Sequence, residues 1–306
     1  MNSLDFIQSS YPVLLEPGDM DVLNRSIQIT ASISVIGCLC NLFLIFYEGI
    51  HKKPIMKALI ALCFTDLTAN ITGLVTTFPK THESTCTALS FFMAFGFVGS
   101  VLFTCCISHS YKVLRLSSSY ESWVKKTSSL IYSYLIISFS GTFLFAILAT
   151  IGRTLRLSES KYCSHYGKPD GIFETCVFTA LMVGLPILSI CYCLYCYYAI
   201  VKAAGLKKAG RYVLFFYPLI LIFCFLPLGI SELMRNFSDG TKPFSPLLVS
   251  ISMYLQGILN SLVYGIFSAI YRRCCLNRQI KDPLIANAEN SYSSSELESE
   301  RKFSLA

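Results

Sequence analysis

Charged residues are scarce in this sequence, and their scarcity indicates the class of protein. Asp, Glu, Lys and Arg make up 14% of the 306 residues, whereas hydrophobic residues make up 54%, and the mean hydropathy is +0.57. Soluble domains carry roughly a quarter charged residues. The composition therefore predicts an integral membrane protein. The net charge of +7 gives no reason to expect a nucleic-acid partner, because in such a protein the side of the bilayer on which cations lie is what matters.

The sequence also lacks the motifs of enzymes. Its four histidines are scattered, and it contains no metal-ligand spacing of His and Cys, no phosphate-binding loop and no nucleophile elbow. We therefore expect neither an enzyme nor a metal or other cofactor. A light-driven retinal protein would need a lysine in the last apolar stretch, and residues 247–270 contain none.

The first 25 residues lack a basic n-region and a long apolar h-region, and they contain Asp5, Glu16, Asp19 and Asp21. We therefore expect no cleavable signal peptide. The first membrane helix is then expected to act as its own targeting signal.

Seven apolar segments are each long enough to cross a bilayer as a helix. They run from Ile27 to Tyr47, Ile55 to Phe78, Cys86 to Tyr111, Ser128 to Ile151, Ile172 to Ile200, Arg211 to Met234, and Leu247 to Ile270. Basic residues are more numerous on the side that holds the C-terminus, which predicts an outside N-terminus and a cytoplasmic C-terminus. We thus expect an all-α membrane protein: an extracellular segment over 1–26, a seven-transmembrane-helix bundle over 27–271, and a largely disordered cytoplasmic tail over 272–306.

Polar side chains lie inside several apolar segments, where lipid would leave them unsatisfied. Gln256 and Asn260 stand in the last segment, and Asp66 and Asn70 share one face of the second. A carboxylate at mid-membrane costs about 2.5–3.5 kcal/mol on insertion scales, so Asp66 is predicted to face the bundle interior. On the residues alone, these groups either bond helices together or line an internal cavity.

Several short motifs resemble those of G-protein-coupled receptors. Asn41 and Asp66 stand where rhodopsin-like receptors have a helix 1 asparagine and a helix 2 aspartate. The stretch Cys224-Phe225-Leu226-Pro227 is similar to Cys-Trp-x-Pro, and Asn260-Ser261-Leu262-Val263-Tyr264 is similar to Asn-Pro-x-x-Tyr. Because Ser261 replaces that proline, the last helix is expected to be straighter than in many receptors.

Two motifs differ from those of rhodopsin-like receptors and argue against that class of the superfamily. The third predicted helix ends in Ser108-His109-Ser110-Tyr111-Lys112 instead of Asp-Arg-Tyr, and the fourth has no tryptophan. With Tyr217-Pro218-Leu219-Ile220 and a very short third inner loop, the chain is most similar to the cyclic-AMP-receptor-like family. That family comprises the slime-mould chemoattractant receptors and their relatives in other protists.

The resemblance implies roles for particular residues. Cys86 and Cys163 stand where most receptors have a disulfide, although Cys176 as partner or two free thiols are the alternatives. The implied activation switch comprises Asn41, Asp66, Asn70, Phe225, Pro227, Asn260 and Tyr264, for which structural packing is the alternative. The implied face for a heterotrimeric G protein comprises Tyr111, Lys112, Arg115, Lys207, Lys208 and Arg272, for which anchoring to the membrane surface is the alternative.

Basic residues on the predicted outer side oppose the overall charge bias. They predict a basic vestibule for an anionic small-molecule ligand such as a cyclic nucleotide; a solvated, salt-bridged loop is the alternative. The vestibule residues are Arg153, Arg156, Lys161 and Arg235, with Glu174 and Glu232 as counter-ions.

Three kinds of modification are predicted from local motifs. Asn24 and Asn236 stand in glycosylation sequons. Cys274 and Cys275 follow two arginines just inside the predicted membrane boundary, a context that suits palmitoylation. Serines among the acidic residues of the tail are candidate phosphorylation sites.

The expected function is that of a plasma-membrane, multi-pass G-protein-coupled receptor. It would transduce an extracellular ligand signal to a heterotrimeric G protein through rearrangement of helices 6 and 7. The alternative is a seven-helix transporter. Such transporters often contain internal repeats, and no convincing repeat relates the first three predicted helices to the last three.

Overall fold

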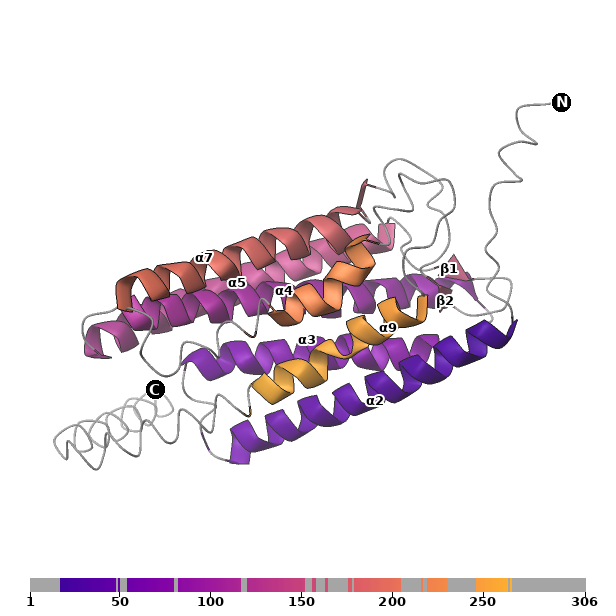
Figure 1. Cartoon of the computed structure of the whole chain (residues 1–306), viewed down its shortest axis with the longest axis horizontal. Helices are drawn as coiled ribbons and strands as arrows, with labels where there is room; N and C mark the ends of the chain where they lie inside the picture. The colour runs from indigo at the N-terminus through magenta and orange to yellow at the C-terminus, as the bar shows by residue number, and fades with distance from the viewer. Residues whose placement is uncertain are drawn as a thin grey trace, which may run out of the picture. The chain divides into compact units, whose positions relative to one another are not determined.

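Almost all of the described structure is helical (Figure 1). The computed structural model describes residues 17–47, 49, 54–79, 82–116, 120–151, 156–157, 163–164, 176–177, 179–204, 216, 219–230, 246–263 and 265. Its elements are α2 (Pro17–Tyr47), α3 (Pro54–Thr76), α4 (Glu83–Leu116), α5 (Tyr120–Ile151), β1 (Arg156–Leu157), β2 (Cys163–Ser164), the π-helical turn η2 (Ala180–Gly184), α7 (Leu185–Ala204) and α9 (Pro246–Tyr254). A further apolar helix covers Leu219–Ile230, and helical structure continues beyond α9 to Val263.

Five of these helices are long and apolar enough to cross a membrane. The candidate spans are Asp21–Tyr47, Ile55–Thr76, Glu83–Val113, Leu130–Ile151 and Leu185–Lys202. Two shorter apolar helices, Leu219–Ile230 and Leu247–Val263, stand where the sixth and seventh segments were predicted. The described part of the chain is therefore a helical bundle of the kind found in membrane proteins.

Three helices begin or end outside the predicted apolar segments. α2 begins at Pro17, inside the stretch predicted as a polar extracellular segment, and proline suits the first position of a helix. α4 continues to Leu116, and α5 begins at Tyr120 instead of Ser128. Apolar composition marks only the part of a helix that lies in lipid, whereas backbone hydrogen bonding sustains the helix beyond it.

α4 is the central element of the described bundle. It packs against α3, α5 and α7, and β1 also contacts it. Phe103, Met93 and Ile107 on α4 are among the largest fully buried side chains. Because helices surround α4 on several sides, its residues set the distances between α3, α5 and α7.

Glycine permits the closest of these approaches. A Cβ atom on Gly96 of α4 would lie 2.5 Å from the backbone nitrogen of Ala69 on α3, a distance that no real contact allows. A Cβ atom on Gly99, one turn further along, would lie 2.4 Å from Cγ2 of Thr65. The backbones of α3 and α4 therefore meet along a strip that has no room for a side chain.

We expect Gly96→Ala to lower the thermal stability of the purified protein in detergent, with a loss of about 1–3 kcal/mol from overpacking. Gly141→Ala on α5 is the matched control, because its Cβ would meet only the end of the Leu102 side chain, at 3.4 Å. Equal melting temperatures for the two variants would contradict the close approach of α3 and α4.

Candidate functional site

A buried carboxyl group links α3 to the last helix. Asp66 on α3 is 2% exposed, and Asn260 is 6% exposed. The Asn260 side chain donates a hydrogen bond from Nδ2 to Oδ2 of Asp66 at 2.9 Å. The Ser100 hydroxyl of α4 also interacts with the carboxyl group of Asp66. A carboxyl group in the interior of a membrane protein needs such partners, so Asp66 ties three helices together.

Two further amides extend this contact into a network. Asn70, one turn after Asp66, donates from Nδ2 to the Asp66 carbonyl at 2.8 Å. Gln256, one turn before Asn260, donates from Nε2 to Oγ of Ser100 at 2.7 Å. Gly257 lies against α2 and α3, since a Cβ there would be 3.0 Å from Nδ2 of Asn70 and 3.1 Å from Cβ of Ser34. The last helix is therefore packed tightly against both of these helices.

The last helix is interrupted beside the network. α9 ends at Tyr254, Leu255 forms a turn, and helix resumes over 256–263. The Ser34 hydroxyl of α2 donates to the Tyr254 carbonyl and accepts from the Ile258 N–H at 3.2 Å. In an uninterrupted helix these two backbone groups would bond each other. The Ser34 hydroxyl of α2 thus takes the place of the backbone hydrogen bond between Ile258 and Tyr254.

Helical structure runs through Ser261 over 256–263, so the expectation of a straighter last helix at that position stays a prediction. Ser261 replaces the proline of the resembling motif, and its hydroxyl donates to the Gly257 carbonyl at 2.8 Å within its own helix. The interruption occurs earlier, at Leu255, and its cause is Ser34. Sequence reasoning about the last helix alone had no way to find a partner on the first one.

Two side-chain atoms of the network have no partner. Oδ1 of Asn70 and Oε1 of Gln256 are buried and have no hydrogen-bond partner among the residues that the structure describes. Buried amides normally satisfy both of their polar ends. A network with unused acceptors can exchange partners when helices shift, whereas a fully paired network resists such exchange.

An aromatic cluster lies on the other side of the interruption. The Phe97 ring of α4 lies 6.2 Å from the Phe225 ring and 6.1 Å from the Tyr254 ring, between centroids. Oγ of Ser252 donates to the Val249 carbonyl of its own helix at 2.8 Å and also lies 3.3 Å from the Cys224 carbonyl oxygen. The Leu219–Ile230 helix is thereby joined to α4 and α9.

The predicted switch residues do not all come together. Asp66, Asn70 and Asn260 meet in the network, whereas Asn41 is buried on α2, where it interacts with Cys63 of α3. Phe225 belongs to the aromatic cluster, with Pro227 two residues further along the same helix. Tyr264 lies outside the described residues. Sequence reasoning missed the hydrogen-bonding roles of Ser34 and Ser100, because serine in an apolar helix is common and carries no signal of its own.

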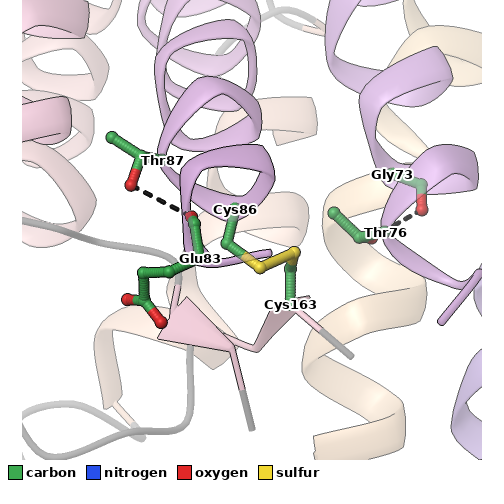
Figure 2. The surroundings of a disulfide bond; sticks show 6 residues. All are labelled: Gly73, Thr76, Glu83, Cys86, Thr87 and Cys163. Atoms are coloured by element: carbon green, nitrogen blue, oxygen red, sulfur yellow. Dashed lines mark hydrogen bonds between the residues drawn. A yellow bond between two sulfur atoms is a disulfide. The ribbon is translucent and has the colours of Figure 1, made fainter. Parts of the chain in front are cut away.

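A disulfide joins the beginning of α4 to the β1–β2 pair, as predicted. Cys86 and Cys163 are bonded with their Cα atoms 5.4 Å apart, and Cys176 is free and exposed. Figure 2 shows the bond beside the first turn of α4. β1 and β2 are antiparallel, with Arg156 opposite Ser164. The bond therefore fixes the backbone of Arg156, one of the predicted vestibule residues, near this end of α4.

Most of the remaining predicted residues lie outside the part of the chain that the structure describes. The other vestibule residues, Arg153, Lys161, Glu174, Glu232 and Arg235, lie outside the described residues, as do Lys207, Lys208, Arg272, Asn236, Cys274 and Cys275. Asn24 lies within α2 and not in a loop.

At the far end of α4, the predicted G-protein face needs one correction. Tyr111 is 5% exposed, because that face of α4 packs into the bundle, and it is therefore not available at the surface. Lys112 is half-buried, with its ammonium group over the Tyr195 ring of α7. The structure describes only the backbone of Arg115.

We expect the Asp66–Asn260 hydrogen bond to appear as a coupling energy. A double-mutant cycle of Asp66→Ala and Asn260→Ala should give about 0.6–2 kcal/mol in detergent unfolding experiments. Thr68→Ala with Asn260→Ala is the control pair, since the Thr68 hydroxyl donates only to the Phe64 carbonyl of its own helix. Additive effects in both pairs would show that the bond does not couple α3 to the last helix.

The disulfide closes a separation of 77 residues, and a closed loop stabilises by restricting the unfolded chain. We expect Cys163→Ser to lower the free energy of unfolding by about 2–4 kcal/mol. Cys176→Ser should leave it unchanged, because Cys176 is free and exposed. Thermal unfolding with and without reductant measures both effects, and insensitivity of the unsubstituted protein to reductant would contradict the bond.

Known proteins add no further constraint on these residues. No protein-family model matches the chain, and no curated protein matches it. Within the described residues, no group of three or more His, Cys, Asp or Glu side chains is placed to hold a metal ion.

Proposed function

We propose that this chain is a G-protein-coupled receptor of the cyclic-AMP-receptor-like kind, in which the Asp66–Asn260 contact is the centre of the activation switch. The observation that carries the proposal is the hydrogen bond between these two buried side chains, at 2.9 Å. It supports a switch because it joins the last helix to α3 within a network that retains unused polar atoms. Switching proteins need an element with two discrete arrangements.

The interruption at Leu255 supports the same proposal. Residues 256–263 carry Gln256 and Asn260, and the Ser34 hydroxyl replaces the backbone hydrogen bond between Ile258 and Tyr254 that would join them to α9. The neighbouring bonds from Leu255 to Ile251 and from Leu259 to Leu255 remain. A helix with one backbone bond replaced can bend at that point. Rearrangement of the inner part of the last helix is then the step that would alter the surface offered to a G protein.

The disulfide supports the proposed orientation in the membrane. Disulfides form on the oxidising side of a cell membrane, so the beginning of α4 at Cys86 would lie outside the cell. The other end of α4, which holds Lys112, would then lie at the cytoplasm. This orientation agrees with the positive-inside rule and with a location in the plasma membrane with the N-terminus outside.

The ligand proposed for the receptor is a small extracellular anion. The tethered β1 strand holds Arg156 near the outer end of α4. Arg153, Lys161 and Arg235 belong to the same proposed vestibule on sequence grounds. Cationic side chains around a narrow entrance raise the local concentration of an anionic ligand, and cyclic nucleotides are one class that fits.

The test is exchange of a labelled GTP analogue on a heterotrimeric G protein co-expressed with the chain. Cyclic AMP is the first probe, followed by a panel of small anions. We expect probe-dependent exchange above that of membranes without the chain. Asn260→Ala should reduce this exchange by about tenfold at equal surface expression, within the usual range of coupling between sites. Thr68→Ala, whose hydroxyl bonds only its own helix, should retain it.

Two outcomes would overturn the proposal. One is an absence of exchange across the whole panel together with probe flux into vesicles that contain the chain, which would favour the transporter alternative. The other is full exchange in both Asn260→Ala and Asp66→Asn, which would remove the network from the switch.

A further inference from the structure

One strip of α4 reaches the bundle surface between α5 and α7. His109 and Lys112 stand one turn apart on α4, and both are half-buried. The His109 ring lies 5.0 Å from the Tyr134 ring of α5 and 6.0 Å from the Tyr192 ring of α7, between centroids. Nδ1 of His109 also shares a hydrogen bond with the Tyr192 hydroxyl. The strip is therefore bordered by tyrosines from two helices.

Lys112 carries a positive charge at the end of this strip. Its Nζ atom lies 4.4 Å from the centre of the Tyr195 ring, within the range of a cation–π interaction. That interaction leaves the three N–H donors of the ammonium group available. Among the residues that the structure describes, Lys112 forms no ion pair. The site thus presents an oriented cation whose charge no described carboxylate neutralises.

The surroundings of Lys112 are those of a protein surface at a lipid headgroup. Tyr195 is 55% exposed and Tyr198 is 61% exposed, and tyrosine is enriched at membrane interfaces because its ring is apolar and its hydroxyl is polar. Deeper along the same helices, Leu188 of α7 and Ile137 of α5, which lies one turn from Tyr134, are exposed. A polar site at one level is followed by an apolar surface, which matches a phospholipid lying against the protein.

We propose that Lys112 binds the phosphate group of an anionic phospholipid in the cytoplasmic leaflet, held by Tyr192 and Tyr195, with the acyl chains along Leu188 and Ile137. Charge complementarity selects the occupant, because the cytoplasmic leaflet is rich in anionic lipids and a lysine near its surface attracts them. The choice of leaflet rests on the orientation proposed above, whereas the site itself does not require receptor activity. Its failure and that of the proposed function are therefore separate results.

Native mass spectrometry of the full chain in detergent, titrated with phosphatidylserine or phosphatidylcholine, tests the site. We expect the first phosphatidylserine to bind more tightly than phosphatidylcholine, and Lys112→Gln to weaken it about fivefold. Tyr195→Leu should weaken it as well, because the ring orients the ammonium group. Lys112→Arg and Tyr195→Phe should retain binding, and they show that loss in the other variants is not a failure to fold.

Lys202→Gln is the matched control, since Lys202 is an exposed cation in the last turn of α7 at the same end of the bundle. Equal weakening by Lys202→Gln and Lys112→Gln would show diffuse attraction and overturn the site. Displacement of the lipid by equimolar inorganic phosphate would identify a site for free phosphate instead. A change of oligomeric state in Lys112→Gln with unchanged lipid binding would assign the strip to a second copy of the chain.

Discussion

The need to satisfy one carboxyl group inside an apolar bundle determines the arrangement around it. Asp66 has almost no contact with solvent, and an unsatisfied polar group in such surroundings costs several kcal/mol. Asn260 and Ser100 supply the partners from two other helices, so the position of the last helix is set by a polar requirement and not by apolar packing alone. Gly257 and Gly96 then follow as consequences, because helices drawn together by these bonds leave no room for larger side chains.

α4 connects the Asp66 network to both ends of the described bundle. At one end it is bonded to the β1–β2 pair through Cys86, and at its middle Ser100 receives the Gln256 hydrogen bond. At its other end Lys112 meets the Tyr195 ring of α7. A change in the position of α4 would therefore affect contacts at both of its ends, because a helix moves as a stiff rod compared with the loops that join it.

The sequence predicted those features that depend on residue type within a single segment. The helical membrane class followed from composition, and the interior position of Asp66 followed from the cost of its exposure to lipid. The pairing of Cys86 with Cys163 followed from a resemblance. The start of α2 at Pro17 and the burial of Tyr111 were not predicted, because apolar length does not mark where a helix leaves lipid and a short motif does not show which face packs. The partner of the Tyr254 carbonyl was out of reach for the same reason, since it lies 220 positions away in the chain.

That partner has a consequence for how the last helix can change. One hydroxyl, on Ser34, serves as donor to the Tyr254 carbonyl and as acceptor for the Ile258 N–H. Both bonds depend on the same oxygen atom, so withdrawal of α2 frees two backbone groups at once, and those two groups are complementary to each other. The backbone bond between Ile258 and Tyr254 can therefore form in one step, since its neighbours, from Leu255 to Ile251 and from Leu259 to Leu255, are already in place.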